Sequence, residues 1–423
     1  MVIDKDNIKI LLIILVLGLG IGYAYINSDL NINGTAQVNS ANWDVHWANI
    51  QVTSGSVSGT NVVTAPTISN STTVNYSIIL NIPGDYYEFT VDAVNGGSID
   101  AMIDTIDSKL NGATITTLPD YLKYTVTYSD GVELAPNHQL LHNTTETYKV
   151  RIEYRTDIEL NQLPGTNQTL SLQFTVTYRQ ATDDAVAVDH SFNGHSWATI
   201  ISNVKSGNTS NYNVVDTKTV DMGTFGTHTL RIANKSTPAE CSTTGFSQTA
   251  CGFVLEFADI IVEYNMNSTL TNIGGWPASE LSTYVNSDIY NALPIELKNG
   301  IINTTVVSGH GSNDSSNFTS TDKLYLLSPT EVWEDVDGNE GIDYFDTAWS
   351  NTRQLDYYSV QGVTTYNCEG AVKQLRESSA AWWLRSATYD YSDRFCVTSF
   401  SGTFYERNKA NSSVGVSPAF RIG

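Results

Sequence analysis

The stretch Leu170-Ser171-Leu172-Gln173-Phe174-Thr175-Val176-Thr177-Tyr178 decides the fold of the first half of the chain. Large apolar side chains occupy every second position in it, and the residues between them are polar. Because the side chains of a β-strand point alternately to the two faces of a sheet, this period of two predicts a strand with one buried face and one solvated face.

The same alternation recurs in the preceding part of the chain, at residues 43–47, 74–82, 87–91, 99–103, 124–128 and 148–154. Many such strands with short turns between them are typical of an antiparallel β-sandwich. We therefore predict a chain that is mainly β, with a β-sandwich over residues 27–180.

Composition excludes some classes of partner. The chain has 423 residues, and its 44 acidic and 22 basic side chains give a net charge of −22. A nucleic-acid binder needs Lys and Arg to neutralise phosphates, and attraction to anionic lipid also needs a basic surface. We expect no nucleic-acid partner. The length suggests two or three domains.

The N-terminus indicates the compartment. Residues 10–26 are almost all apolar and follow Lys5 and Lys9. Residues 1–26 are thus expected to be a signal peptide or an uncleaved membrane anchor. No basic residue occurs between Lys9 and Lys109, which fits export of the chain beyond the apolar segment. We expect an extracytoplasmic protein that is secreted or held at the membrane by its N-terminal helix.

Four cysteines occur in this exported part, at positions 241, 251, 368 and 396. An even number outside the cytosol suggests two disulfides, and three pairings are possible. We favour Cys241–Cys251, which clips a short Ser/Thr-rich loop, together with Cys368–Cys396. A zinc site is disfavoured for these cysteines, because the chain has no C-x-x-C.

After a predicted linker at residues 181–189, the sequence pattern changes from strands alone to a mixture of helices and strands. Leu281, Val285, Ile289 and Leu293 recur every four residues and predict a helix that Pro294 ends. Short strands are expected at residues 324–327, 382–385, 395–399 and 418–422. Residues 190–423 should therefore form an α+β domain with a long irregular middle.

The first half resembles the camelysin and biofilm-fibre family of exported Gram-positive proteins. The resemblance lies in Pro83-Gly84-Asp85-Tyr86-Tyr87-Glu88-Phe89-Thr90-Val91 and Val94-Asn95-Gly96-Gly97-Ser98-Ile99-Asp100-Ala101, among other structural motifs. It implies an exported β-sandwich and self-association through the sandwich, as in a matrix or fibre subunit.

Some members of that family have been called metallopeptidases, and His138-Gln139-Leu140-Leu141-His142 has two histidines four apart. Gln139 replaces the carboxylate that a zinc protease needs to activate water, so protease activity is disfavoured. The alternative interpretation has Leu140 and Leu141 in the core and the two histidines exposed.

The second half resembles an uncharacterised family of bacterial surface domains. Its marks include Trp382-Trp383-Leu384-Arg385-Ser386-Ala387 and Gly415-Val416-Ser417-Pro418-Ala419-Phe420-Arg421-Ile422. The order of an aromatic strand, a variable hairpin and a final strand is also similar to the C-type lectin fold. Trp382 and Trp383 could form a sugar-stacking platform, or one Trp could lie in the core with Arg385 paired internally.

The hairpin at residues 388–413 is the candidate ligand-binding element. Tyr, Asn and Arg side chains give rigid contact area and adaptable hydrogen bonds, as in binding paratopes. An ordinary polar hairpin is the alternative. The candidate ligand-binding residues are Tyr389, Tyr391, Asp393, Arg394, Phe400, Tyr405, Arg407 and Asn408.

An acidic loop offers a candidate calcium site. Oxygen-bearing side chains alternate around glycines there, and calcium takes six to eight oxygen ligands. A solvated acidic loop without an ion is the alternative. The candidate ligands are Asp335, Asp337, Asn339 and Asp343.

These observations predict a non-catalytic surface protein that recognises an extracellular glycan or surface protein through its C-terminal domain, without a required cofactor. One alternative is a structural subunit of a matrix or fibre. Another is a glycan-active or formylglycine-generating-like enzyme, for which Cys368 and Cys396 would be the candidate cysteines.

Overall fold

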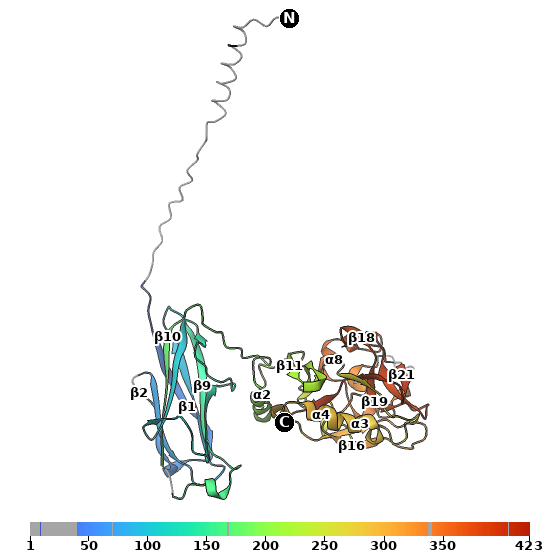
Figure 1. The fold of residues 1–423 in the computed structure, drawn as a ribbon, viewed down its shortest axis with the longest axis horizontal. Coiled ribbons are helices and arrows are strands. Elements are labelled where there is room, and N and C mark those ends of the chain that lie inside the picture. Colours follow the sequence, from blue (N-terminus) through green and yellow to red (C-terminus); the bar gives the residue numbers. More distant parts are fainter. Residues whose placement is uncertain (1–8, 10–39, 70, 167–168, 337–340, 405) are drawn as a thin grey trace. The chain divides into compact units, whose positions relative to one another are not determined.

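The computed structural model describes residue 9 and residues 40–69, 71–166, 169–336, 341–404 and 406–423 (Figure 1). Within the described residues, Trp43–Gly423 form the larger unit, and the division from the rest of the chain falls at Asn42. The predicted leader helix at residues 10–26 lies outside the described residues. Within the described ranges, no helix has both the length and the apolar character that a membrane crossing requires.

The first part of the larger unit is built from strands in two antiparallel sheets. One sheet has the order β1-β4-β9-β7, and the other has the order β2-β3-β10-β5-β6 with β8 paired to β5. Two 3₁₀ turns, η1 (Gly59–Asn61) and η2 (Leu160–Gln162), lie in the connections. The strands are β1 (Val45–Gly55), β2 (Val62–Ser69), β3 (Thr73–Ile79), β4 (Tyr86–Asn95), β5 (Ala101–Leu110), β6 (Ala113–Thr114), β7 (Leu122–Tyr128), β8 (Gln139–Leu140), β9 (Thr144–Tyr154) and β10 (Thr169–Gln180).

The inward-facing side chains of the two sheets form one shared hydrophobic core, and burial alternates along their strands. Along β4 every second residue is buried, and the residues between them are partly exposed. On β10 the buried positions are Leu170, Leu172, Phe174 and Val176, as the period of two predicts. They pack with inward-facing residues of the other sheet, among them Phe89 and Val150, in a single hydrophobic cluster.

The prediction that Leu140 and Leu141 both lie in the core is correct for one of them. Leu140 is buried, but Leu141 is 48% exposed, because the strand ends at Leu140 and the chain turns away. His142 is exposed and its Nδ1 lies 2.7 Å from Oδ1 of Asp100, whereas His138 is half-buried beside Tyr128. The two imidazoles therefore have different partners.

The predicted linker at residues 181–189 contacts the β-sandwich through hydrogen bonds of Val186. The N–H of Val186 donates to the carbonyl of Asn137 at 2.8 Å, and the carbonyl of Val186 accepts from the N–H of Gln139 at 2.9 Å. Asp183 and Asp184 are exposed, as predicted for a solvated segment.

The second part of the larger unit combines further sheets with short helices. Its sheets have the orders β11-β12-β13-β23, β14-β22-β19-β20-β21, β15-β16 and β17-β18, and β19 runs parallel to β22. The strands are β11 (Thr217–Asp221), β12 (Thr227–Asn234), β13 (Val254–Phe257), β14 (Val262–Tyr264), β15 (Thr304–Ser308), β16 (Phe318–Asp322), β17 (Lys373–Leu375), β18 (Ser378–Ala380), β19 (Trp382–Ala387), β20 (Arg394–Thr398), β21 (Glu406–Lys409), β22 (Val414–Val416) and β23 (Ala419–Arg421).

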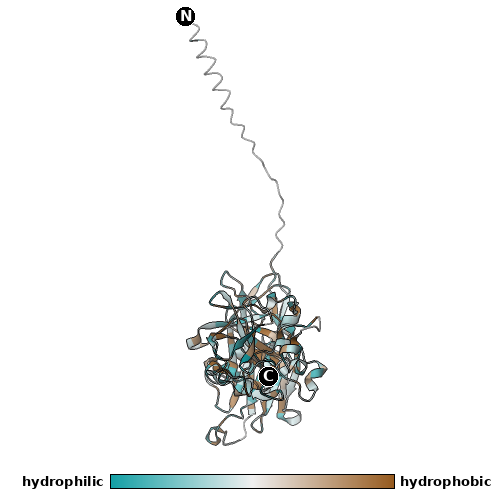
Figure 2. Ribbon diagram, turned by 90° about the vertical axis from the view of Figure 1, so that its right-hand side faces the viewer, coloured by the Kyte–Doolittle hydropathy of each residue, from teal (hydrophilic) through white to brown (hydrophobic). Residues whose placement is uncertain are grey.

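The helices of this part are short. In Figure 2 hydrophobic and hydrophilic segments alternate along the ribbon, and the hydrophobic colour is densest near the middle of the view. The α-helices are α2 (Trp197–Ser206), α3 (Glu280–Tyr284), α4 (Tyr290–Ala292), α5 (Ile295–Lys298), α6 (Pro329–Val332), α7 (Ile342–Phe345) and α8 (Asp356–Val360). The other helical turns are η3 (Gly223–Phe225), η4 (Ala239–Ser242), η5 (Trp276–Ala278), η6 (Val285–Ile289), η7 (Trp349–Asn351) and η8 (Glu369–Ala371).

The predicted apolar stripe is confirmed as one buried helical face. Leu281, Val285, Ile289 and Leu293 are all buried. Ser279 caps the start of α3 by accepting from the N–H of Ser282. The middle of the helix, η6, is a π-helical turn. A π-turn holds more residues than an α-helical turn, which keeps a spacing of four on one face.

The sugar-stacking interpretation of the double Trp is wrong. Trp382 and Trp383 are both fully buried, because β19 is a central strand with both faces covered. Their indole N–H groups donate to backbone carbonyls, at 3.1 Å and 2.8 Å. Arg385 is paired internally as the alternative predicts: its guanidinium donates to both carboxylate oxygens of Glu331, at 2.5 Å and 2.6 Å.

One of the two predicted disulfides is present. Cys241 and Cys251 are bonded, but Cys368 and Cys396 are free thiols, so the second pairing is wrong. Cys396 lies on β20 with its side chain in the hydrophobic core. Cys368 precedes η8, and its sulfur lies 3.5 Å from the carbonyl of Thr364. The two side chains are thus held in separate environments.

Candidate functional site

The hairpin β20–β21 positions the predicted ligand-binding residues. In its register Cys396 lies opposite Arg407, and Phe395 lies opposite Asn408. A tight turn precedes β20: the N–H of Thr388 donates to the carbonyl of Arg394 at 3.2 Å. Residues 388–393 are the loop that joins β19 to β20, and the carbonyl of Asp393 in it accepts from the N–H of Ala410, just after β21, at 2.8 Å.

Two guanidinium groups pack against the ring of Tyr391. The guanidinium carbons of Arg394 and Arg407 are 4.3 Å and 4.7 Å from the centre of its ring. Nη1 of Arg407 also donates to both carboxylate oxygens of Asp390, at 3.2 Å and 3.1 Å. Each cation–π contact at an exposed site contributes about 0.5–1 kcal/mol, so this cluster holds its own geometry before any ligand arrives.

The remaining predicted hairpin residues do not all lie beside Tyr391. Tyr389 is 54% exposed, and its ring centre lies 6.1 Å from that of His310. Asp393 pairs weakly with Arg394, at 3.8 Å. Phe400 is 68% exposed but belongs to the turn that joins β20 to β21, at the opposite end of the strands from Tyr391. Tyr405 lies outside the described residues.

A groove with a cavity of about 410 Å³ lies on the same domain. Trp349 is 48% exposed on it, whereas Trp333 is buried, with its indole N–H donating to the carbonyl of Gly402 at 3.1 Å. The polar side chains on the groove include three carboxylates and one amide. The lining residues are Thr330, Trp333, Glu334, Asp335, Ile342, Asp343, Trp349 and Gln354.

Helix α7 joins the groove to the hairpin. Its first residues, Ile342 and Asp343, line the groove. Its last residue, Phe345, has its ring centre 5.2 Å from the guanidinium of Arg407. The carbonyl of Phe345 accepts from the N–H of Tyr389 at 3.4 Å. The groove and the Tyr391 cluster are therefore neighbouring parts of one surface, which we call the aromatic–carboxylate surface.

The structure describes two of the four predicted calcium ligands. Asp335 and Asp343 both line the groove. Oδ2 of Asp335 accepts from the N–H of Ile342 at 3.3 Å. Asp337 and Asn339 lie outside the described residues, so calcium binding stays a prediction.

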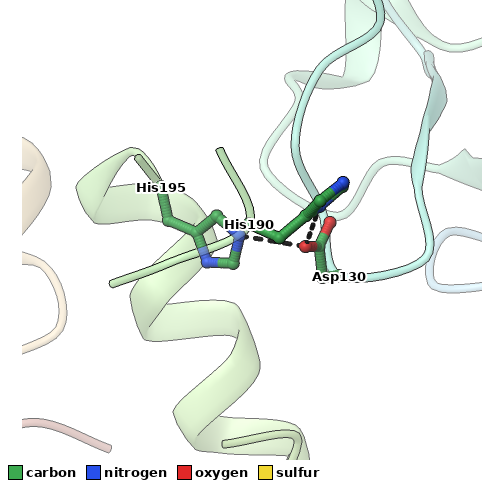
Figure 3. A group of neighbouring side chains, drawn as sticks. All are labelled: Asp130, His190 and His195. Atoms are coloured by element: carbon green, nitrogen blue, oxygen red, sulfur yellow. Dashed lines mark hydrogen bonds and ion pairs between the residues drawn. The ribbon is translucent and has the colours of Figure 1, made fainter. Parts of the chain in front are cut away.

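A second cluster, Asp130, His190 and His195, was not found from the sequence (Figure 3). Oδ2 of Asp130 lies 2.6 Å from Nδ1 of His190 and 3.1 Å from Nε2 of His195. Asp130 is on the turn after β7, and His195 stands directly before the cap of α2. The spacing of five between the two histidines is a signal for this cluster in the sequence, but Asp130 comes 60 residues earlier.

Hydrogen bonds control the ionisation of this cluster. Burial opposes the charge on Asp130, but bonds from His195, from the N–H of Val132 and from His190 outweigh it and lower its pKa to about 2. Oε2 of Glu146 lies 3.8 Å from Nε2 of His190, and burial raises the pKa of the Glu146 carboxyl. Asp130 is thus a carboxylate at neutral pH.

Residues 253–423 match the model of a family described as a domain of unknown function (DUF6273). The match contains the aromatic–carboxylate surface and begins later than the boundary near residue 190 that the sequence suggests. Searches of the curated proteins and of the solved structures found no match to this chain.

Proposed function

We propose that this chain is a non-catalytic, extracytoplasmic protein that recognises a carbohydrate through the aromatic–carboxylate surface. The observation that carries the proposal is the half-exposed indole of Trp349 on a groove whose polar side chains are mainly carboxylates. An aromatic face packs against the C–H face of a pyranose ring. Carboxylate oxygens beside it accept hydrogen bonds from sugar hydroxyl groups.

The polar lining favours a neutral or amino sugar over an anionic one. Glu334, Asp335 and Asp343 are exposed at the groove and repel a carboxylated or sulfated ligand. Gln354 adds a carbonyl oxygen that accepts hydrogen bonds, since its amide N–H groups already donate to the carbonyls of Val332 and Val363, at 2.9 Å and 2.7 Å. The net charge of −22 acts in the same direction over the whole chain.

The hairpin supplies a second contact zone in this proposal. Tyr389 offers exposed aromatic area, and Arg394 and Arg407 hold Tyr391 in place. A binding surface that is fixed before the ligand arrives loses less conformational entropy on binding. The resemblance to the C-type lectin layout, in which this region commonly binds ligands, supports the same assignment.

Extracytoplasmic location rests on the apolar segment near the N-terminus and on the Cys241–Cys251 disulfide, since such bonds persist mainly in oxidising compartments. An enzymatic role is less supported. Burial raises the pKa of both free thiols, Cys368 and Cys396, whereas a nucleophilic cysteine needs a lowered pKa.

A structural subunit is the second candidate function. β2 is an edge strand of its sheet, and Val63 on it is 53% exposed. Such an edge presents backbone groups with which a strand of another copy can pair. Concentration-dependent filaments of the full chain would favour this function, and their absence at high concentration would argue against it.

The test of the recognition function is a glycan array probed with the purified full chain, in calcium and in EGTA. We expect saturable signal on neutral or amino glycans and little on sialylated or sulfated ones. Loss of the signal in EGTA that excess calcium restores and zinc does not would assign the acidic loop a part in binding. Absence of glycan signal under both conditions, with correctly folded protein, would contradict the proposal.

A further inference from the structure

We propose that Asp130, His190 and His195 form a binding site for a divalent transition-metal ion such as zinc. This site is separate from the aromatic–carboxylate surface and does not depend on the proposed function. Two imidazoles and a carboxylate are a common ligand set for zinc, and their donor atoms here all lie within 4.8 Å of one another.

One nitrogen of each histidine faces the same carboxylate oxygen. Nδ1 of His190 and Nε2 of His195 both face Oδ2 of Asp130, from different segments of the chain (Figure 3). A tetrahedral ion with ligands at about 2.0 Å would set its donor atoms roughly 3.3 Å apart. The contacts of 2.6 Å and 3.1 Å would have to lengthen slightly to admit the ion, and the two histidine nitrogens already lie within 4.8 Å of each other.

Each histidine also has an oxygen on its far side. Nδ1 of His195 lies 2.5 Å from the hydroxyl of Tyr212, and Nε2 of His190 faces Oε2 of Glu146 at 3.8 Å without a hydrogen bond. Metal-bound histidines characteristically donate their second N–H to a carboxylate or another oxygen, which fixes the ring and its tautomer. The unbonded Nε2 of His190 is the atom whose N–H would point at Glu146 once the ion holds Nδ1.

The surrounding contacts hold the ligands in place. Nδ2 of Asn203, on α2, donates to the carbonyl of Asp130 at 2.7 Å and to the hydroxyl of Tyr212 at 2.9 Å. Oγ1 of Thr199 donates to the carbonyl of Gly131 at 3.2 Å. The ion would thus link the start of α2 to the turn after β7. Its binding energy would stabilise the contact between these two segments.

The test is zinc binding to metal-stripped full-length chain, measured by isothermal titration and by metal analysis after dialysis. His190→Ala and Asp130→Asn are the ligand variants, and His142→Ala is the matched control, since His142 pairs with Asp100 at 2.7 Å without a second histidine. We expect one zinc per chain in the wild type and in the control. Both ligand variants should bind at least tenfold more weakly.

Glu146→Gln keeps the result interpretable if a ligand variant folds poorly. It leaves all three proposed ligands in place and should weaken zinc binding about tenfold. At the same zinc concentration, the unfolding temperature of the wild type should rise more than that of His190→Ala. Absence of stoichiometric zinc binding in the wild type, or equal binding in wild type, His190→Ala and Asp130→Asn, would overturn the proposal and leave the cluster a hydrogen-bond network only.

Discussion

At the scale of single residues, the pair Arg385–Glu331 shows what a buried charge does in this domain. Both side chains are fully buried, and two charge-assisted hydrogen bonds join them. Oε1 of Glu331 also accepts from the hydroxyl of Thr352 at 2.8 Å. Neither charge has access to water, so each depends on the other for stabilisation.

Removing one partner of this pair should be strongly destabilising. Arg385→Met should lower the free energy of unfolding by about 3–5 kcal/mol, because it leaves the carboxylate of Glu331 buried without its counter-charge. Urea denaturation followed by circular dichroism measures this. Lys409→Met, at an exposed position, is the control and should change stability by less than about 0.5 kcal/mol. A loss for Arg385→Met as small as that of the control would contradict the buried pair.

His228 should make stability depend on pH. Its Nδ1 lies 2.8 Å from Oδ2 of Asp259, and its Nε2 lies 3.0 Å from the carbonyl of Phe225. The hydrogen bond to Asp259 outweighs burial and raises the pKa of His228 above 6.5. The charged form is therefore favoured in the folded state. This stabilisation is full below the unfolded pKa of about 6.5 and is lost as the pH rises through the folded value.

Unfolding temperatures of the wild type and of His228→Gln, measured from about pH 6 to about pH 8.5, test this effect. The difference in stability between them should shrink as the pH rises, since the wild type loses the interaction of its imidazolium with Asp259. A difference that grows with pH would contradict the assignment.

At the scale of elements, most of the strands and helices that could be predicted were predicted from local hydrophobic periodicity. The strands around Phe174 and Phe89 follow the period of two, because alternation depends only on neighbouring residues. The buried stripe of the helix beginning at Glu280 was also predictable, but its π-turn was not. Burial of both Trp382 and Trp383 was missed, because it depends on the central position of β19 in its sheet.

Cysteine pairing is tested at this same scale. Mass spectrometry of peptides from non-reduced protein should show a Cys241–Cys251 bond and unmodified thiols at Cys368 and Cys396. Under denaturing conditions a thiol reagent should label two cysteines per chain. Cys396 should resist labelling in the native protein, because it is buried. A Cys368–Cys396 bond would contradict the structure.

At the scale of the whole molecule, the sequence indicated a mainly β chain but not which distant residues meet. Composition singled out Tyr391, Arg394 and Arg407, but it did not show that both guanidinium groups pack on the Tyr391 ring. Ligand binding by this hairpin stays a prediction. The groove was not foreseen, because Trp349 and Glu334 come from segments without a regular pattern. The meeting of Asp130 with His190 and His195 was missed for the same reason, since it joins residues 60 or more positions apart.

The central claim is that Trp349 stacks on a carbohydrate. The most direct test titrates the strongest glycan from the array into wild type, Trp349→Ala and Trp43→Ala. Trp43 is the matched control, because it is 44% exposed, lies before β1 and is not among the residues that line the groove. We predict that Trp349→Ala binds about tenfold more weakly, or about 1.4 kcal/mol, and that Trp43→Ala binds like wild type. Equal affinity in all three proteins would contradict the account.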